Sequence, residues 1–177
     1  QQRGQLESGC VVSTVMANKG LQVALKKERI RMLRTQVGDR YVLGEMLRGD
    51  HALGGEQSGH VIMRANSLVG DGILSALKMS QILLEEGGSL TDLARGFEKY
   101  PQILINVRVR KKRDYSKIAE IQKEIEAASK KLGERGRVVI RYSGTEPLVR
   151  IMLEGEKETE IKKYAETIAA RFQEKLG

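Results

Sequence analysis

The chain has 177 residues, of which 40% are hydrophobic, so it is long and apolar enough for one or two compact domains. One cysteine and two histidines exclude an internal disulfide framework and leave no convincing Cys/His metal site. The net charge of +8 favours an anionic partner, which could be a phosphorylated metabolite, nucleic acid or an acidic domain outside this chain.

The first half of the chain alternates runs typical of strands with runs typical of helices. Asn18 is suited to cap a helix, and the turn 70–72 opens a longer helix whose apolar residues predict burial against a sheet. Those apolar residues are Ile73, Leu77, Leu83 and Leu84. The expected strands are 11–16, 30–35 and 61–63, and the other expected helices are 19–27, 40–48 and 90–97. This order predicts an α/β layered domain over residues 1–97.

The pattern changes after residue 101. Strict alternation predicts a half-exposed strand over 103–109, and a helix with apolar residues three and four apart follows and ends at Gly133. Two further strands, 137–141 and 148–154, precede a last helix with an apolar stripe. This β-α-β-β-α order predicts a smaller α+β domain over 98–177, with a mostly antiparallel sheet and helices on one face.

The loop between the last two strands has the composition of an oxyanion-binding site. Ser143 and Thr145 supply hydroxyl donors, and Gly144 allows a sharp turn whose amides can point inward as a nest. Arg141 and Arg150 can each bond two phosphate oxygens and offset phosphate charge. An ordinary polar turn has the same composition, so the residues alone leave both interpretations open.

A second loop, over residues 54–60, suits a small polar ligand. Glu56 can accept hydrogen bonds from two vicinal sugar hydroxyls, and Gln57 and Ser58 can donate or accept. His60 could bind phosphate or shuttle a proton, and no other residue of the chain is a catalytic candidate. Taken alone, a glycine-rich hairpin is the simpler interpretation, and Glu56 with His60 are too few ligands for a metal.

Together the two loops resemble a known pair. Residues 55–60 look like the sugar-binding loop of the α-D-phosphohexomutases, and residues 141–147 look like their phosphate-binding loop. Four more segments match the superfamily in the same order, namely 14–21, 37–42, 70–73 and 148–155. Within the superfamily, Gln57 and the run 38–42 are similar to the bacterial phosphoglucosamine mutase branch. Val69 departs from the pattern, because a threonine is usual there, which weakens a ligand role for the turn that follows.

The resemblance implies both a fold and a site. Residues 1–97 would form the third, α/β domain of a four-domain enzyme, and residues 98–177 its fourth, TATA-binding-protein-like α+β domain. Sugar hydroxyls would be held near Glu56, Gln57, Ser58 and His60, and Gly38, Asp39 and Arg40 would face the cleft. The phosphate that is not transferred would be held by Arg141, Ser143, Gly144, Thr145 and Arg150.

The same resemblance implies partners for this chain. The phosphoserine and the Mg²⁺ loop of the superfamily lie on its first and second domains and have no counterpart in this sequence. Since the chain also begins with Gln1, we expect a piece of a longer enzyme, for which a homodimer is one option. That enzyme would interconvert glucosamine 6-phosphate and glucosamine 1-phosphate through a bisphosphate, in amino-sugar and cell-wall precursor synthesis. By itself the chain would be inactive, bind no metal and bind phosphosugar weakly.

The sequence also predicts where the protein is located and leaves two alternative functions open. No apolar run approaches a membrane span and no signal-peptide pattern opens the chain, so we expect a cytoplasmic protein without membrane contact. A stand-alone basic module could instead use the +8 charge to bind anions or nucleic acid, although 4% aromatic residues offer few stacking platforms. The other alternative is a related mutase that acts on mannose or glucose phosphates, and Gln57 is the chief residue that argues against this alternative. The resemblance favours a hexosamine phosphate and no nucleic acid.

Overall fold

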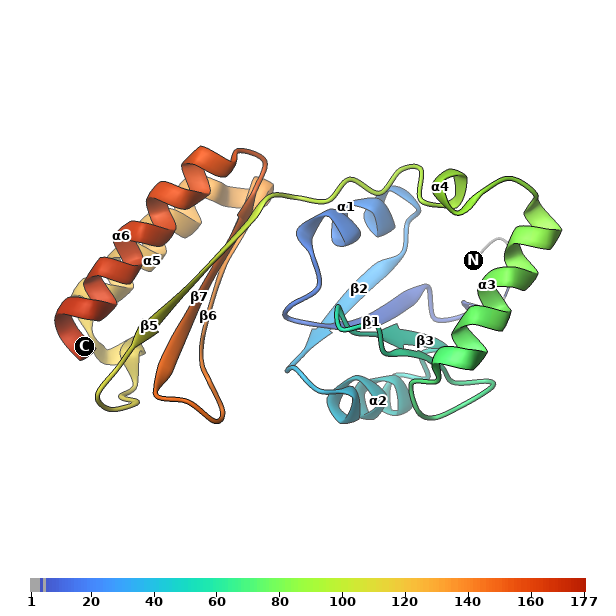
Figure 1. Cartoon of the computed structure of the whole chain (residues 1–177), viewed down its shortest axis with the longest axis horizontal. Helices are drawn as coiled ribbons and strands as arrows, with labels where there is room; N and C mark the ends of the chain where they lie inside the picture. The colour runs from blue at the N-terminus through green and yellow to red at the C-terminus, as the bar shows by residue number, and fades with distance from the viewer. Residues whose placement is uncertain (1–3, 5) are drawn as a thin grey trace. The chain divides into compact units, whose positions relative to one another are not determined.

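The computed structural model describes residue 4 and residues 6–177. The chain divides into two compact units, of which the first ends at Lys99 and the second runs from Tyr100 to Gly177. Each unit has its own sheet and its own helices (Figure 1). The α/β and α+β classes predicted for the two halves are both confirmed.

The first unit is built on a four-stranded sheet with the order β2-β1-β3-β4, in which only β4 is antiparallel. Figure 1 shows α1 and α2 on opposite sides of this sheet, as right-handed crossovers leaving β1 and β2 in opposite directions require. The strands are β1 (Cys10–Thr14), β2 (Arg31–Thr35), β3 (Leu53–Gly55) and β4 (Val61–Met63). The helices are α1 (Lys19–Lys27), α2 (Asp39–Arg48), α3 (Gly72–Glu86) and α4 (Leu90–Leu93).

A small apolar core lies between the sheet and α2. Val12, Val42, Met46 and Ile62 are buried together. A Cβ on Gly54 would come within 2.5 Å of the Met46 sulfur, so the glycine lets α2 approach β3 closely. This packing fixes the start of α2 beside the end of β3, where the 54–60 loop begins.

Helix α3 corrects one sequence-based prediction. Asp71 is its N-cap, and the Asp71 carboxylate accepts hydrogen bonds from the amides of Ile73 and Leu74. None of its residues is buried, however, and the side chains of Ile73, Leu77 and Leu84 are 77%, 64% and 87% exposed. Apolar periodicity indicates which face of a helix favours burial, but it does not supply the surface that buries it. Helix α4 also ends early, at Leu93 instead of residue 97.

The second unit is a three-stranded antiparallel sheet with the order β5-β7-β6. Its strands are β5 (Gln102–Arg108), β6 (Gly136–Tyr142) and β7 (Leu148–Gly155), and its helices are α5 (Ala119–Leu132) and α6 (Glu158–Leu176). Two 3-10 turns, η1 (Tyr115–Lys117) and η2 (Gly133–Arg135), flank α5. Figure 1 shows both helices on one face of the sheet, as predicted.

The core of this unit joins the inner faces of the sheet and helices. It includes Val149, Ile151 and Phe172, all of which are fully buried. Tyr115 makes edge-to-face contacts with Phe172 and with Tyr142, at centroid distances of 5.5 and 5.9 Å. The end of β6 from which the 143–147 loop begins is therefore packed against this core through Tyr142.

Candidate functional site

The 54–60 loop is a hairpin between β3 and β4. The Glu56 amide donates to the His60 carbonyl at 2.8 Å, and the Gly59 amide donates to the Glu56 carbonyl at 3.0 Å. Ser13 braces the start of the loop, because its hydroxyl donates to the Gly55 carbonyl at 2.7 Å. The loop leaves β3 at the carboxyl end of three parallel strands, which is where open α/β sheets place ligands.

The carboxylate of Glu56 is held inside this loop. Its side chain is only 10% exposed, and one oxygen accepts from the Gly38 amide at 2.9 Å. The other oxygen is 4.0 Å from Nδ1 of His60, which also lies 3.0 Å from the Ser58 hydroxyl. Gln57 is exposed. The structure thus brings Glu56, Ser58, His60 and Gly38 together.

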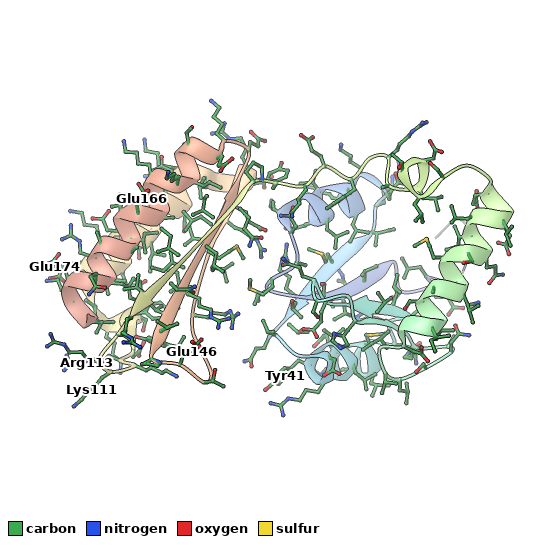
Figure 2. The ribbon with its side chains drawn as sticks, in the orientation of Figure 1. Tyr41, Lys111, Arg113, Glu146, Glu166 and Glu174 are labelled. Carbon is green, nitrogen blue, oxygen red and sulfur yellow. The ribbon has the colours of Figure 1, made fainter. Side chains whose placement is uncertain are left out.

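The other two expected cleft residues, Asp39 and Arg40, make contacts within α2 itself. Asp39 accepts from the Arg40 amide at 2.7 Å in the first turn of α2. The Arg40 guanidinium donates to the Tyr41 hydroxyl at 2.7 Å and lies over the Tyr41 ring at 4.6 Å from its centroid. Of the run 38–40, only Gly38 contacts the Glu56 carboxylate, and its φ of 131° suits glycine. Tyr41, labelled in Figure 2, marks this end of the first unit.

In the second unit, two arginines lie opposite each other. Arg141 on β6 is paired with Arg150 on β7, so their side chains share one face of the sheet. Burial lowers the pKa of Arg141, and the neighbouring charge of Arg150 lowers it further. The Nε of Arg150 is buried and has no hydrogen-bond partner among the described residues. Two adjacent cations with a spare donor make a site that favours an anion.

The 143–147 loop closes beside these arginines. Ser143 is 3% exposed, and its hydroxyl accepts from the Glu146 amide at 3.3 Å and donates to the Glu146 carboxylate at 3.4 Å. The same carboxylate accepts from Arg150 Nη2 at 3.2 Å. Glu146, labelled in Figure 2, therefore supplies negative charge where the sequence predicts a bound anion.

The backbone at Gly144 does not adopt a conformation that requires glycine. Its φ lies outside the left-handed region, and nothing lies within 4 Å of where a Cβ would stand. The turn therefore does not depend on glycine, which corrects the sequence-based argument. The amides of Gly144 and Thr145 donate to no acceptor in the described part of the chain. Both residues are exposed, so these two donors are available to a ligand.

Each unit of the chain matches a model of a known protein family. A family model for the phosphoglucomutase/phosphomannomutase alpha/beta/alpha domain III matches residues 1–100, and one for the C-terminal domain of the same family matches residues 104–171. The chain belongs to the phosphoglucomutase/phosphomannomutase family. The chain spans about 40% of the length of the curated relatives that it matches.

Individual members of the phosphoglucomutase/phosphomannomutase family give the same picture. The chain is 47% identical over 178 residues to a phosphoglucosamine mutase of Clostridium botulinum (strain Loch Maree / Type A3), covering 99% of this chain and 40% of the relative. A phosphoglucosamine mutase of Koribacter versatilis is 46% identical, with coverage of 99% and 38%. The Aspergillus fumigatus N-acetylphosphoglucosamine mutase, solved in complex with glucose 1,6-bisphosphate, shares the fold at a TM-score of 0.75 and 20% identity, covering 93% of this chain and 38% of its own.

The resemblance assigns the Mg²⁺ loop to a domain outside this chain. Among the described residues, no group of three or more His, Cys, Asp or Glu side chains could hold a metal ion. In the same part of the chain, no helix combines the length and the apolar character that crossing a membrane requires.

Sequence reasoning missed three residues that support the two loops. The hydroxyl of Ser13 and the close approach of Gly70, where a Cβ would lie 3.1 Å from His60, shape the 54–60 loop. Lys112 contacts the carbonyls of the 143–147 loop. Lys112 belongs to a basic run visible in the sequence, but its partner lies 31 residues away along the chain.

Proposed function

We propose that this chain binds and orients a hexosamine phosphate for an enzyme that interconverts glucosamine 6-phosphate and glucosamine 1-phosphate through a bisphosphate. The naming of its 46–47% identical relatives as phosphoglucosamine mutases supports this substrate over mannose or glucose phosphates. Each unit would recognise a different part of the ligand, the first its hydroxyls and the second its phosphate.

The observation that carries the proposal is the pairing of Arg141 with Arg150. Like charges on opposed strand positions destabilise a sheet, so their juxtaposition is best explained by a ligand that neutralises both. The unpaired Nε of Arg150 and the accessible amides of Gly144 and Thr145 provide donors on the same loop. Each charge-assisted hydrogen bond to a phosphate would contribute about 1.5–3 kcal/mol. Ser143 would join them once its hydroxyl leaves Glu146.

In the first unit, Glu56 would accept hydrogen bonds from sugar hydroxyls. The Gly38 amide holds the carboxylate in one orientation, so less side-chain entropy is lost when a ligand binds. Gln57 and Ser58 would add donors and acceptors, and His60, 4.0 Å from the carboxylate, would hold or shuttle a proton. Gly38 would act through Glu56, while Asp39 and Arg40 would line the entrance.

The contribution of this chain to catalysis would be positioning. Holding the sugar and its distal phosphate in one geometry lowers the entropic part of the barrier to phosphoryl transfer. The phosphoserine, the Mg²⁺ site, the homodimer and a cytoplasmic location are predictions for the complete enzyme.

The test is a titration of the whole chain followed by amide NMR. Glucosamine 6-phosphate should shift signals of residues 143–145 and 56–60, while glucose 6-phosphate should bind more weakly. Arg141→Ala should abolish the first set of shifts, whereas Arg95→Ala, which removes the same charge beside α4, should preserve them. A DNA duplex at two salt concentrations is the counter-test. Salt-sensitive DNA binding without a response to the sugar phosphate would establish the basic-module alternative instead.

A further inference from the structure

Lys112 contacts the 143–147 loop from the segment that follows β5. Its ammonium donates to the Ser143 carbonyl at 2.6 Å and lies 3.5 Å from the Gly144 carbonyl. These two carbonyls are consecutive in the chain. One side chain therefore engages two successive peptide groups from the same side.

The geometry of the peptide bond converts this contact into an orientation of the amides. In a trans peptide the C=O and the N–H of the same plane point in opposite directions. The plane that carries the Ser143 carbonyl also carries the Gly144 amide, and the plane of the Gly144 carbonyl carries the Thr145 amide. Directing both carbonyls towards Lys112 therefore turns both amides to the opposite side. Two successive amides aimed the same way form an anion-binding nest.

The segment that carries Lys112 is itself fastened to both ends of the loop. The Val109 amide donates to the Pro147 carbonyl at 2.9 Å, and the Tyr142 hydroxyl donates to the Arg113 carbonyl at 2.5 Å. Figure 2 labels Lys111, Arg113 and Glu146 at the same end of this unit. Lys112 thus lies between two hydrogen bonds that connect its segment to the ends of the loop.

We propose that Lys112 is a positioning residue that orients the Gly144 and Thr145 amides towards phosphate. This inference rests on the proposed phosphate site. Lys112 acts from the carbonyl side of the loop and does not touch the ligand. Its positive charge also offsets the partial negative charge of the two carbonyls, which favours the orientation with the amides exposed to an anion.

The experiment measures inorganic phosphate binding to the whole chain by amide NMR. Lys112→Met removes the donor, and Lys112→Arg keeps a cationic donor. Lys111→Met is the matched control, because Lys111 is the adjacent residue, is exposed and carries the same charge. Lys112→Met should weaken phosphate binding by about tenfold, because a misoriented loop would lose about one charge-assisted hydrogen bond from its amides to phosphate. Lys111→Met should change it by less than about twofold, because only a screened charge is lost. Lys112→Arg should recover most of the affinity.

Two further readouts separate orientation from charge and from folding. Without ligand, the Gly144 and Thr145 amide signals should move in Lys112→Met while the signals of the β5-β7-β6 sheet stay in place. At about 0.5 M salt the deficit of Lys112→Met should persist, whereas a long-range charge effect would disappear. Equal affinities of Lys112→Met and Lys111→Met, or unmoved amide signals, would overturn the inference. Failure of the unsubstituted chain to bind phosphate would overturn the phosphate site itself. The unsubstituted chain alone gives that result, so it can be distinguished from a failure of the Lys112 inference.

Discussion

Arg141 and Arg150 face each other across β6 and β7, and the charge of Arg150 contributes to lowering the pKa of Arg141. The fold therefore carries a local electrostatic cost in a position that a hydrophobic or neutral pair would occupy without repulsion. Such a cost is expected where binding, and not stability, determines the residue.

Arg141→Gln should leave the free energy of unfolding unchanged or raise it by up to about 1 kcal/mol, because it removes a like-charge contact. Urea denaturation without ligand measures this. With saturating phosphate the order should reverse, since only the unsubstituted chain gains stability by binding. A loss of more than about 1 kcal/mol without ligand would show that Arg141 is structural instead.

Glu146→Gln should tighten phosphate binding. The carboxylate of Glu146 accepts from Arg150 and from Ser143, so it competes with an incoming anion for both donors. Removing its charge should lower the phosphate Kd by roughly twofold to fivefold, within the range of an exposed ion pair. Calorimetric titration measures the change, and Glu166→Gln, an exposed glutamate of α6 labelled in Figure 2, is the control. Weaker binding in Glu146→Gln would mean that the carboxylate organises the loop for its ligand.

Two glycine substitutions should affect different properties, one the stability of the fold and the other phosphate binding. Gly54→Ala should lower the free energy of unfolding by about 1–3 kcal/mol, because its Cβ would overlap Met46 and Val42. Gly144→Ala should leave stability within about 0.5 kcal/mol, because nothing lies near its Cβ and its φ suits alanine. Phosphate binding should nevertheless weaken in Gly144→Ala, because the methyl group lies beside the amide donors. Thermal unfolding and phosphate titration of both variants test this, and a destabilised Gly144→Ala would contradict it.

The contact between α5 and α6 should be sensitive to acid. A hydrogen bond from Lys175, at 2.6 Å, holds the pKa of Glu120 below its ordinary value of 4.5. Because the pKa is lower in the folded state, the stabilisation is present above the ordinary pKa and is lost as the pH falls through the lower, folded value. Unfolding measured from pH 7 down to pH 3 should therefore show a steeper decline below about pH 4.5 in the unsubstituted chain than in Glu120→Gln. Parallel curves would show that this pair contributes nothing measurable.

The local order of the chain determined most of its secondary structure. Asn18 and Asp71 start helices because their side chains accept from the first free amides, and alternation predicted β6 and β7. The 143–147 loop carries its donors within ten residues of sequence, from Arg141 to Arg150, so its composition allowed an anion site, and only the resemblance favoured that interpretation over an ordinary polar turn. These features depend on neighbours along the chain.

Contacts between distant residues were decided only by the tertiary structure. The amide of Gly38 reaches Glu56 because β2 and β3 both lie in parallel beside β1, which brings their carboxyl ends to one edge of the sheet. Lys112 reaches the Ser143 carbonyl because β5 and β6 flank β7 in one sheet. Apolar periodicity predicted a helix at α3 but not the exposure of Ile73 and Leu84, since burial needs a second surface in space. Sequence pattern records which face of an element is apolar or charged, whereas strand pairing and packing determine what that face meets.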